Sequence, residues 1–150
     1  MNVGRLCTRV MASVSSQETI LAAAQRMSSN DVGTLVVLDG SGAVEAIGIL
    51  TDRDIVLRCV ATGLDPARTK VGAMMTRPVH TVSEQAPVEE AIRLMDQVGT
   101  RRLVVLGESQ RPVGVLSLDD LLDLLAEEAG AIGRLLGKQQ SGLAAAIGAG

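Results

Sequence analysis

The sequence predicts a mixed α/β (α+β) fold of two tandem, pseudo-twofold β-α-β-β-α repeats, followed by a short C-terminal helical tail. Two observations carry this prediction. Residues 3–38 align without a gap on residues 71–106, with 13 identities, and each copy alternates short β-branched runs with stretches of helical periodicity. One such unit cannot cover both faces of its own sheet, so the two copies are expected to pack against each other.

The offset between the copies changes from 68 to 66 residues at one turn, which is two residues longer in the first copy. Beyond it, Ile47–Thr51 aligns with Val113–Ser117 and Asp54 aligns with Asp120. A length change confined to a turn fits a duplicated fold, because loops tolerate insertions. The predicted organisation is repeat 1 at 3–62, a linker at 63–70, repeat 2 at 71–128 and a Gly/Ala-rich tail at 129–150.

Within each copy the elements follow from local patterns. Apolar residues recur at helical spacing in the first helix of each repeat, and Pro87 suits the first turn of the second of these helices. Leu35–Leu38 and Leu103–Leu106 are apolar on both faces, as buried strands are. The expected elements are a strand at about 12–15 and 79–83, a helix at about 18–29 and 86–98, the two buried strands, a second strand at about 44–50 and 112–116, and a helix at about 52–62 and 118–128.

The tail after Gly130 departs from the repeat and is rich in Gly, Ala and Leu. Ile132, Leu135 and Leu136 are expected to form one or two further amphipathic turns. The tail is interpreted as a packing or dimerisation appendage, with a frayed end as the alternative.

Composition excludes several classes of function. The net charge of −3 argues against general nucleic-acid binding, which needs a concentrated basic face. Phe, Tyr and Trp are absent, so no aromatic platform exists for stacked bases. No run of about 18 apolar residues predicts a membrane span, and the N-terminus lacks the apolar core of a signal peptide. Cys7 and Cys59 are interpreted as reduced thiols, and the protein is expected to be cytoplasmic.

The strongest chemical signal is the repeated strand end, Gly48–Asp54 in the first copy and Gly114–Asp120 in the second. A Thr or Ser followed three residues later by an acid fits a helix capping box. The same geometry suits a ligand, because a helix N-terminus attracts phosphate and a carboxylate accepts hydrogen bonds from a ribose diol. Capping and ligand binding are both kept as interpretations, since one hydroxyl can serve both.

The doubled pattern, with Gly-aliphatic-aliphatic-Thr/Ser-x-x-Asp closing each copy, resembles the CBS domain pair, or Bateman module, of stand-alone bacterial proteins. The resemblance covers about residues 3–128. It implies binding of adenosine-containing ligands (AMP, ADP, ATP or S-adenosylmethionine) in clefts between the repeats. By position, the resemblance assigns phosphate or sugar contacts to Thr51 and Ser117, and ribose contacts to Asp54 and Asp120.

The resemblance also implies phosphate contacts from basic residues just before the first buried strand. Arg101 and Arg102 stand there in the second copy, where the first copy has Gly33 and Thr34. An anionic ligand beside a carboxylate needs a counter-charge. The two clefts are therefore expected to differ, with the arginines serving the phosphate-competent one; a solvated turn is the alternative for these side chains.

Other candidates are weaker. Thr8-Arg9 and Thr76-Arg77 are repeated where this family borders the base, or they act as recurrent caps, and Val10 and Pro78 are expected to contribute aliphatic contacts to adenine. Arg53 is interpreted mainly as a surface ion-pair partner. His80 has no Cys or acid at metal-ligand spacing, so no metal site is predicted. Neither cysteine has an identifiable base, so no catalytic residue is predicted.

The sequence thus favours a regulatory, ligand-sensing module over an enzyme. No cofactor is expected apart from an adenine nucleotide as regulatory ligand. The alternative is a structural or interaction protein of the same fold with no nucleotide ligand. The resemblance implies a homodimer assembled through helical faces, and with no catalytic domain in view the protein is expected to act on an unknown protein partner in trans.

Overall fold

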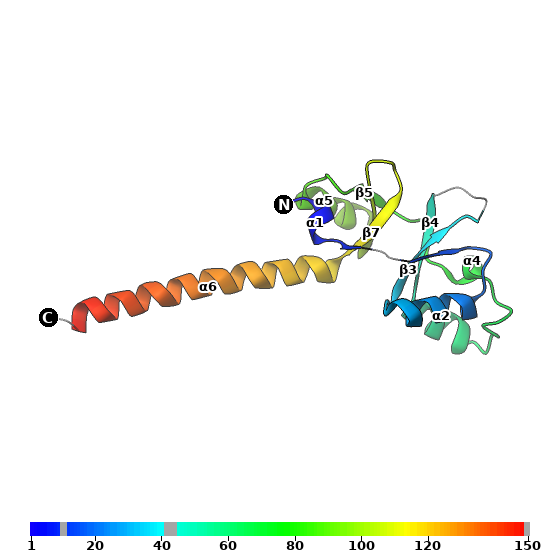
Figure 1. Ribbon diagram of the computed structural model, residues 1–150, viewed down its shortest axis with the longest axis horizontal. Coiled ribbons are helices and arrows are strands. Elements are labelled where there is room, and N and C mark those ends of the chain that lie inside the picture. Colours follow the sequence, from blue (N-terminus) through cyan, green and yellow to red (C-terminus); the bar gives the residue numbers. More distant parts are fainter. Residues whose placement is uncertain (10–11, 41–44, 149–150) are drawn as a thin grey trace. The chain divides into compact units, whose positions relative to one another are not determined.

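The computed structural model describes residues 1–9, 12–40 and 45–148, and its chain divides into two units, Met1–Ser117 and Leu118–Gly150 (Figure 1). The first unit contains both repeats, and the second contains one long helix. The elements of the first repeat are β2 (Ser13–Ser15), α2 (Ile20–Asn30), β3 (Thr34–Leu38), β4 (Ala46–Thr51), α3 (Asp52–Asp54) and the π-helical segment η1 (Ile55–Val60). Those of the second repeat within this unit are β5 (Thr81–Ser83), α5 (Val88–Val98), β6 (Arg102–Leu106) and β7 (Pro112–Ser117).

Helices α2 and α5 form where the periodicity predicts them, and local signals set their ends. The Thr19 hydroxyl caps α2 by accepting the N–H of Ala22 at 3.2 Å. Gly99 ends α5 in the left-handed region at φ +67°, which glycine adopts without a steric penalty. Each helix buries one face: Ile20, Ala23 and Met27 in α2, and Val88, Ala91 and Met95 in α5.

The strands pair in the same register in both sheets, as expected of a duplicated unit. In each repeat the first strand runs parallel to the second, which pairs antiparallel with the third, and both antiparallel pairs shift register one residue before the second strand ends. Ser13 lies beside Val36, and Thr81 lies beside Val104. The sheets are ordered β2-β3-β4 and β1-β7-β6-β5, where β1 is the short strand Thr8–Arg9.

The extra strand β1 (Thr8–Arg9) belongs to the first repeat in sequence and to the second in space. Thr8 pairs with Val115 of β7, and at the equivalent place Thr76 pairs with Ile49 of β4. The short helices α1 (Val3–Leu6) and α4 (Val71–Met74) follow the same rule. The Val3 N–H donates to the Ala86 carbonyl, and the Val71 N–H donates to the Glu18 carbonyl, both at 2.9 Å. The N-terminal segment of each repeat therefore packs against the other repeat, an exchange that the sequence pattern did not predict.

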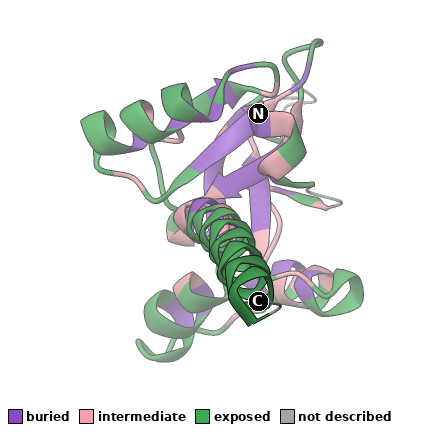
Figure 2. Cartoon of the chain, turned by 90° about the vertical axis from the view of Figure 1, so that its left-hand side faces the viewer, coloured by how far each residue is buried: buried purple, intermediate pink, exposed green. Residues whose placement is uncertain are grey.

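The core explains why the buried strands are apolar on both faces. One cluster of buried residues joins the first repeat's strands to α2, η1 and α4, and includes Ile20, Leu35 and Leu50. A second cluster joins the two sheets through Val36, Ala46, Ile49, Val104 and Val115. The purple strands of Figure 2 lie in these layers. Packing of the repeats against each other, as predicted, thus uses the strand face that the helices leave open.

The C-terminal region corrects the prediction. The expected helix at 118–128 and the tail at 129–150 form one continuous helix, α6, spanning Leu118–Gly148. The tail was expected to hold only one or two further turns. It contains no proline, and its Ala, Leu, Gln and Lys residues favour helix, which outweighs the local cost of its glycines. The other predicted helix, at 52–62, is α3 followed by η1 and ends at Val60. No helix in the described ranges is long and apolar enough to cross a membrane.

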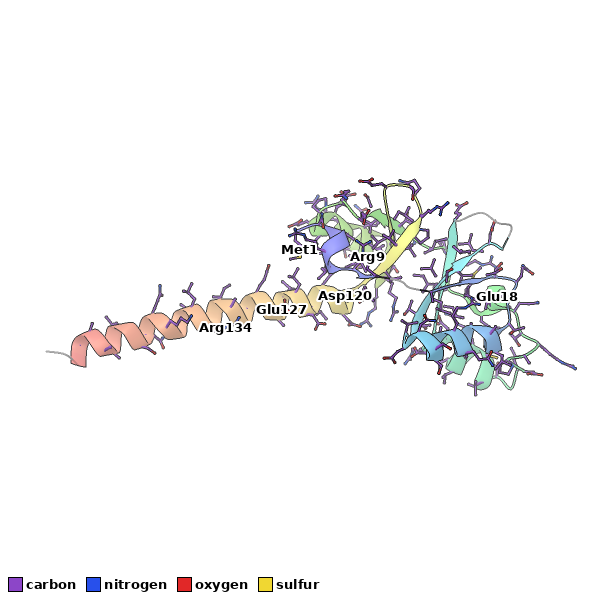
Figure 3. The ribbon with its side chains drawn as sticks, viewed as in Figure 1. Met1, Arg9, Glu18, Asp120, Glu127 and Arg134 are labelled. Atoms are coloured by element: carbon purple, nitrogen blue, oxygen red, sulfur yellow. The ribbon has the colours of Figure 1, made fainter. Side chains whose placement is uncertain are left out.

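An ion pair in the first repeat gives a prediction about stability. Glu18, labelled in Figure 3, accepts two hydrogen bonds from Arg26, at 2.7 and 3.0 Å, and one from the Ser15 N–H at 2.7 Å. The hydrogen bonds from Arg26 hold the pKa of the Glu18 carboxyl below its ordinary value, despite partial burial. A lowered pKa stabilises the fold above the unfolded-state value near 4.3, and that contribution is lost as pH falls through the folded-state pKa.

Glu18→Gln is expected to lower the free energy of unfolding at pH 7 by about 0.5–1 kcal/mol, a magnitude limited by solvent screening of this one-third-exposed pair. The difference from the wild type is expected to shrink as pH falls below the unfolded-state value near 4.3 and approaches the lowered pKa of the folded state. Urea unfolding at pH 7 and at pH 3.5 measures both values. Glu108→Gln, at an exposed turn, is the control and is expected to change neither. A penalty that stays constant with pH would contradict this account.

Candidate functional site

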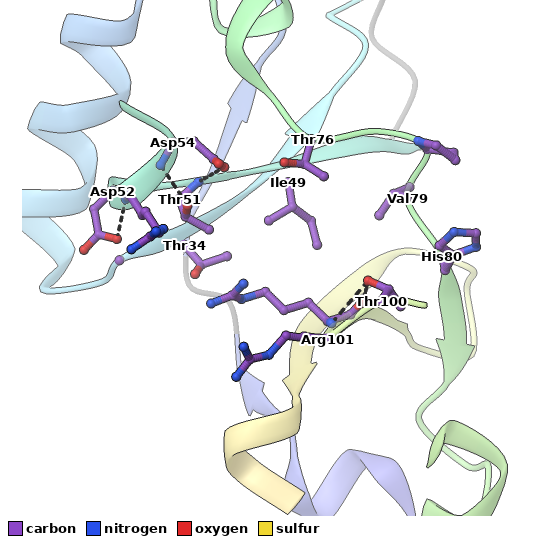
Figure 4. A pocket seen from close by; sticks show the side chains of 14 residues that line it. Thr34, Ile49, Thr51, Asp52, Asp54, Thr76, Val79, His80, Thr100 and Arg101 are labelled. Carbon is purple, nitrogen blue, oxygen red and sulfur yellow. Dashed lines mark hydrogen bonds between the residues drawn. The ribbon is translucent and has the colours of Figure 1, made fainter. Parts of the chain in front are cut away.

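A cavity of about 390 Å³ opens between the repeats in the first unit (Figure 4). Four segments line it: Gly33–Thr34 where β3 begins, the end of β4 with α3, the stretch from Thr76 to His80 that leads into β5, and the turn from Thr100 to Arg102 that begins β6. Its volume lies within the range of small-molecule sites. The lining residues are Gly33, Thr34, Ile49, Thr51, Asp52, Arg53, Asp54, Thr76, Pro78, Val79, His80, Thr100, Arg101 and Arg102.

Thr51 and Asp54 form the capping box that their spacing predicts. The Asp54 N–H donates to Thr51 Oγ1 at 3.1 Å, and the Thr51 N–H donates to Asp54 Oδ2 at 3.0 Å. Asp54 Oδ1 also lies 3.4 Å from the Arg58 guanidinium. A carboxylate has about four acceptor positions, so this group retains capacity toward a ligand, and the Thr51 hydroxyl retains its proton as a donor. Capping and ligand contact are compatible here.

The opposite wall of the cavity is basic. Arg101 and Arg102 are both exposed and line the cavity at the start of β6, and Figure 4 shows Arg101 across the cavity from Thr51 and Asp54. The turn is held by Thr100, whose Oγ1 donates to the Arg102 carbonyl at 3.1 Å. The sequence left open which of the two strand ends these arginines accompany. They line the cavity together with Thr51 and Asp54, the strand end of the first copy. The cavity combines three guanidinium groups with two carboxylates.

The contrast between Gly33 and Arg101 has a local cause. The Asp52 N–H donates to the Gly33 carbonyl at 3.0 Å, and a Cβ on Gly33 would lie 2.9 Å from Asp52 Oδ2. A larger residue at position 33 would collide with the carboxylate of Asp52. The counterpart of Asp52 in the second copy is Leu118, so no carboxylate occupies the equivalent position there.

The structure brings together five of the eight predicted site residues: Thr51, Asp54, Pro78, Arg101 and Arg102. The other three are not among the lining residues that the structure describes. Val10 lies outside the described residues. Ser117 ends β7 in the first unit, whereas Asp120 lies on α6 in the second unit, so the two are not placed in a common site.

Several lining residues were not predicted as site residues. Repetition of Thr8 at position 76 marked the segment that carries Thr76, whereas nothing in the sequence marked Val79 or Thr100. His80, considered only as a metal ligand, is a lining residue, and Arg53, interpreted mainly as an ion-pair partner, is another. Among the described residues no three His, Cys, Asp or Glu side chains gather as a metal-binding group.

The family model described as CBS domain matches the chain twice, at residues 3–60 and 71–127. The chain belongs to the CBS domain family. Hypoxic response protein 1 of Mycobacterium tuberculosis is 34% identical over 129 residues, covering 86% of this chain and 84% of the relative. The CBS domain-containing protein YhcV of Bacillus subtilis is 36% identical over 114 residues, covering 76% and 78%. The uncharacterized protein MK0525 of Methanopyrus kandleri is 32% identical over 83% of this chain, which spans 62% of that relative.

Solved structures show that the two repeats form a CBS pair. Hypoxic Response Protein I, crystallised with two coordinated zinc ions, superposes with a TM-score of 0.65 at 30% identity, covering 82% of this chain and 98% of that one. The CBS domain pair of MJ0100, in complex with 5′-methylthioadenosine and S-adenosyl-L-methionine, superposes with a TM-score of 0.68 over 85% of this chain and 98% of that one. Its identity of 23% is a likeness of fold alone.

Proposed function

We propose that this CBS pair is a ligand-sensing regulatory protein that binds an adenosine-containing nucleotide in the cavity between its repeats. One observation carries the proposal: Thr51 and Asp54 line the same cavity as Arg101 and Arg102. Carboxylate acceptors suit a ribose diol, and guanidinium groups suit a phosphate. A nucleoside phosphate offers both groups on one small molecule.

The remaining walls suit the base. Ile49, Pro78 and Val79 give the cavity an aliphatic portion, which can cover an adenine ring without aromatic stacking. The three guanidinium groups outnumber the two carboxylates, so a phosphate-bearing ligand is favoured over an uncharged nucleoside. The MJ0100 structure holds adenosine-containing ligands in the same fold, which supports the ligand class without identifying the compound.

Regulation in place of catalysis is proposed from the same residues. The cavity's side chains bind and orient, and no nucleophile paired with a base is evident among the described lining residues. The protein is proposed to signal to a protein partner in trans and to form a homodimer through the helical faces of the repeats. Val56, Leu57 and Val60 of η1 are 49–59% exposed and offer an apolar face for that dimer.

A second function is favoured by the completeness of the capping box. Since Thr51 and Asp54 satisfy each other, their pattern is explained without any ligand, as in a structural or interaction protein of this fold. Loss of a capping interaction costs about 1 kcal/mol of stability in either case. Only ligand affinity separates the two functions.

Asp54→Ala is expected to weaken binding of AMP at least tenfold and to lower the free energy of unfolding by about 1 kcal/mol. Titration calorimetry and urea unfolding measure the two effects. Thr19→Ala removes a cap of α2 away from the cavity and is the matched control, with a similar loss of stability and unchanged affinity. Equal affinity in all three proteins, or no saturable binding of AMP, ADP, ATP or S-adenosylmethionine to the wild type, would favour the structural function.

The composition offers a further check on the same proposal. The chain has no Trp or Tyr, so its own absorbance at 280 nm is minimal. A nucleotide that copurifies with the protein is therefore expected to dominate the absorbance near 260 nm and to be released on denaturation.

A further inference from the structure

Helix α6 carries a stripe of exposed aliphatic side chains. The stripe is defined by Leu125, Ile132, Leu136, Leu143 and Ile147, which are 55–73% exposed. At about 100° per residue their side chains fall within about 60° of one another around the helix axis. Every residue of α6 from Leu125 to Gly148 is exposed, as the green end of the helix in Figure 2 shows, and Leu121 is the single buried residue of the helix among those described.

The stripe has a period of 11 residues, visible as Leu125, Leu136 and Ile147 and again as Ile132 and Leu143. A period of 11 is close to three α-helical turns, so the stripe stays on one face of a nearly straight helix. Charged side chains such as Asp123, Arg134 and Lys138 lie on the opposite face. An amphipathic helix of this length is stabilised chiefly by packing of its apolar face against a partner.

The glycines of α6 strengthen the need for a partner. Gly133, Gly137 and Gly142 lie within the helix, and a Cβ on any of them would meet nothing within 4 Å. Glycine in an exposed helix interior is unfavourable relative to alanine. A helix with several such positions needs packing along its length to remain formed.

We infer that the aliphatic stripe is the contact surface for α6 of a second copy of this chain, with the two helices antiparallel. Four of the five stripe residues are placed symmetrically about residue 134, and only Ile147 has no counterpart within the stripe. In an antiparallel pair centred there, Leu125 lies opposite the partner's Leu143, and Ile132 lies opposite the partner's Leu136. The face is therefore complementary to a copy of itself.

The polar residues that interrupt this face support the same orientation. Glu128 and Gln139 lie on the stripe's side of the helix, at about −60° and −40° from Leu125 around the helix axis. About the same centre, Glu128 falls opposite the partner's Gln140, next to Gln139. A carboxylate acceptor then faces amide donors, which can satisfy it.

The charges on the outer face agree with this orientation. All five acids of α6 lie within residues 119–128, and both bases, Arg134 and Lys138, lie beyond them. A parallel pair would gather the acids of both helices at one end of the pair, where their like charges repel at low ionic strength. An antiparallel pair separates the two acidic segments to opposite ends and sets Lys138 at the same level along the pair as the acidic segment of the partner. The excess of acids also disfavours docking on an anionic lipid surface.

The mass of the full chain tests the inference. Leu136→Glu is expected to halve the sedimentation mass relative to the wild type at micromolar concentration, whether the wild type is a dimer or a larger assembly that also uses the repeats. Ser141→Glu adds the same charge on the opposite face and is the control, with unchanged mass. An unchanged mass for Leu136→Glu, or a monomeric wild type, would overturn the inference and indicate that the stripe packs within its own chain.

Cross-linking tests the orientation without depending on the glutamate variant. A chain carrying Leu125→Cys and a tagged chain carrying Leu143→Cys are expected to form a mixed disulfide when combined, and little homodimeric disulfide when oxidised separately. Native Cys7 and Cys59 are buried and remain in place. Self-cross-linking by each variant alone would overturn the antiparallel arrangement. Cosedimentation of the wild type, but not of Leu136→Glu, with phosphatidylcholine or phosphatidylserine vesicles, without self-association, would assign the stripe to a lipid surface and overturn the inference.

Discussion

Replacing Arg101 and Arg102 together with alanine is expected to weaken AMP binding about a hundredfold and to change adenosine binding little. Each guanidinium can form a charge-assisted hydrogen bond with a phosphate, and loss of one such bond at an exposed site corresponds to about tenfold in affinity. Adenosine lacks the phosphate, so it reports the ribose and base contacts alone. Titration calorimetry with both ligands gives the four affinities that the comparison needs.

Two controls accompany the double variant. Arg93→Ala removes an exposed guanidinium from α5, which does not line the cavity, and is expected to leave both affinities unchanged. Raising the salt concentration is expected to weaken AMP binding in the wild type more than in the double variant, because screening acts on the charge pairs. Parallel losses for AMP and adenosine would show that the arginines shape the cavity and do not bind phosphate.

Gly114→Ala is expected to lower the free energy of unfolding by about 2–3 kcal/mol, and Gly48→Ala by about 1 kcal/mol, although the two glycines occupy equivalent positions. A Cβ on Gly114 would lie 2.7 Å from the Thr8 carbonyl oxygen and 2.9 Å from the buried Cys7 sulfur, so the backbone of β1 must move. A Cβ on Gly48 would first meet Met75 Sδ at 2.6 Å. A methionine end can rotate away more easily than a paired strand.

Urea unfolding of the two variants measures this difference directly. Gly137→Ala is the control, because its Cβ would meet nothing within 4 Å and alanine favours helix; its stability is expected to be unchanged or higher by up to about 1 kcal/mol. If Gly114→Ala proved no less stable than Gly48→Ala, the exchanged strand β1 would not be held against β7 as tightly as its geometry indicates.

The repeat, its strands and most of one wall of the cavity could be predicted from the sequence, because those features are local or are repeated. Duplication made Leu35–Leu38 and Leu103–Leu106 recognisable as strands, and the Thr51–Asp54 spacing predicted a capping box that the structure confirms. Their assignment to ligand binding stays a prediction. Pairing of Thr8 with Val115 could not be predicted, because two residues carry no periodicity and their partner lies more than a hundred residues away.

The prediction for the C-terminal region was wrong because a change in composition was interpreted as the end of a helix. The glycines after residue 129 suggested a separate short tail, yet no proline interrupts α6, and the helix continues to Gly148. The membership of Val79 and Thr100 in the cavity depends on how the two repeats meet, which no single-repeat pattern encodes. The facing of Arg101 and Arg102 toward Thr51 depends on the same contact.

The exchange of N-terminal segments has a consequence for synthesis of the protein on the ribosome. The first repeat lacks its docked α4 until residues 71–74 have emerged, and β1 has no partner until β7 is complete. The nascent chain must therefore hold residues 8–9 unpaired while about a hundred further residues are added, and neither half can finish folding alone. Contacts this distant in sequence favour slow, concerted folding of the whole first unit. The two repeats therefore fold together, and a chain cut between them would leave each repeat without the segment that the other supplies.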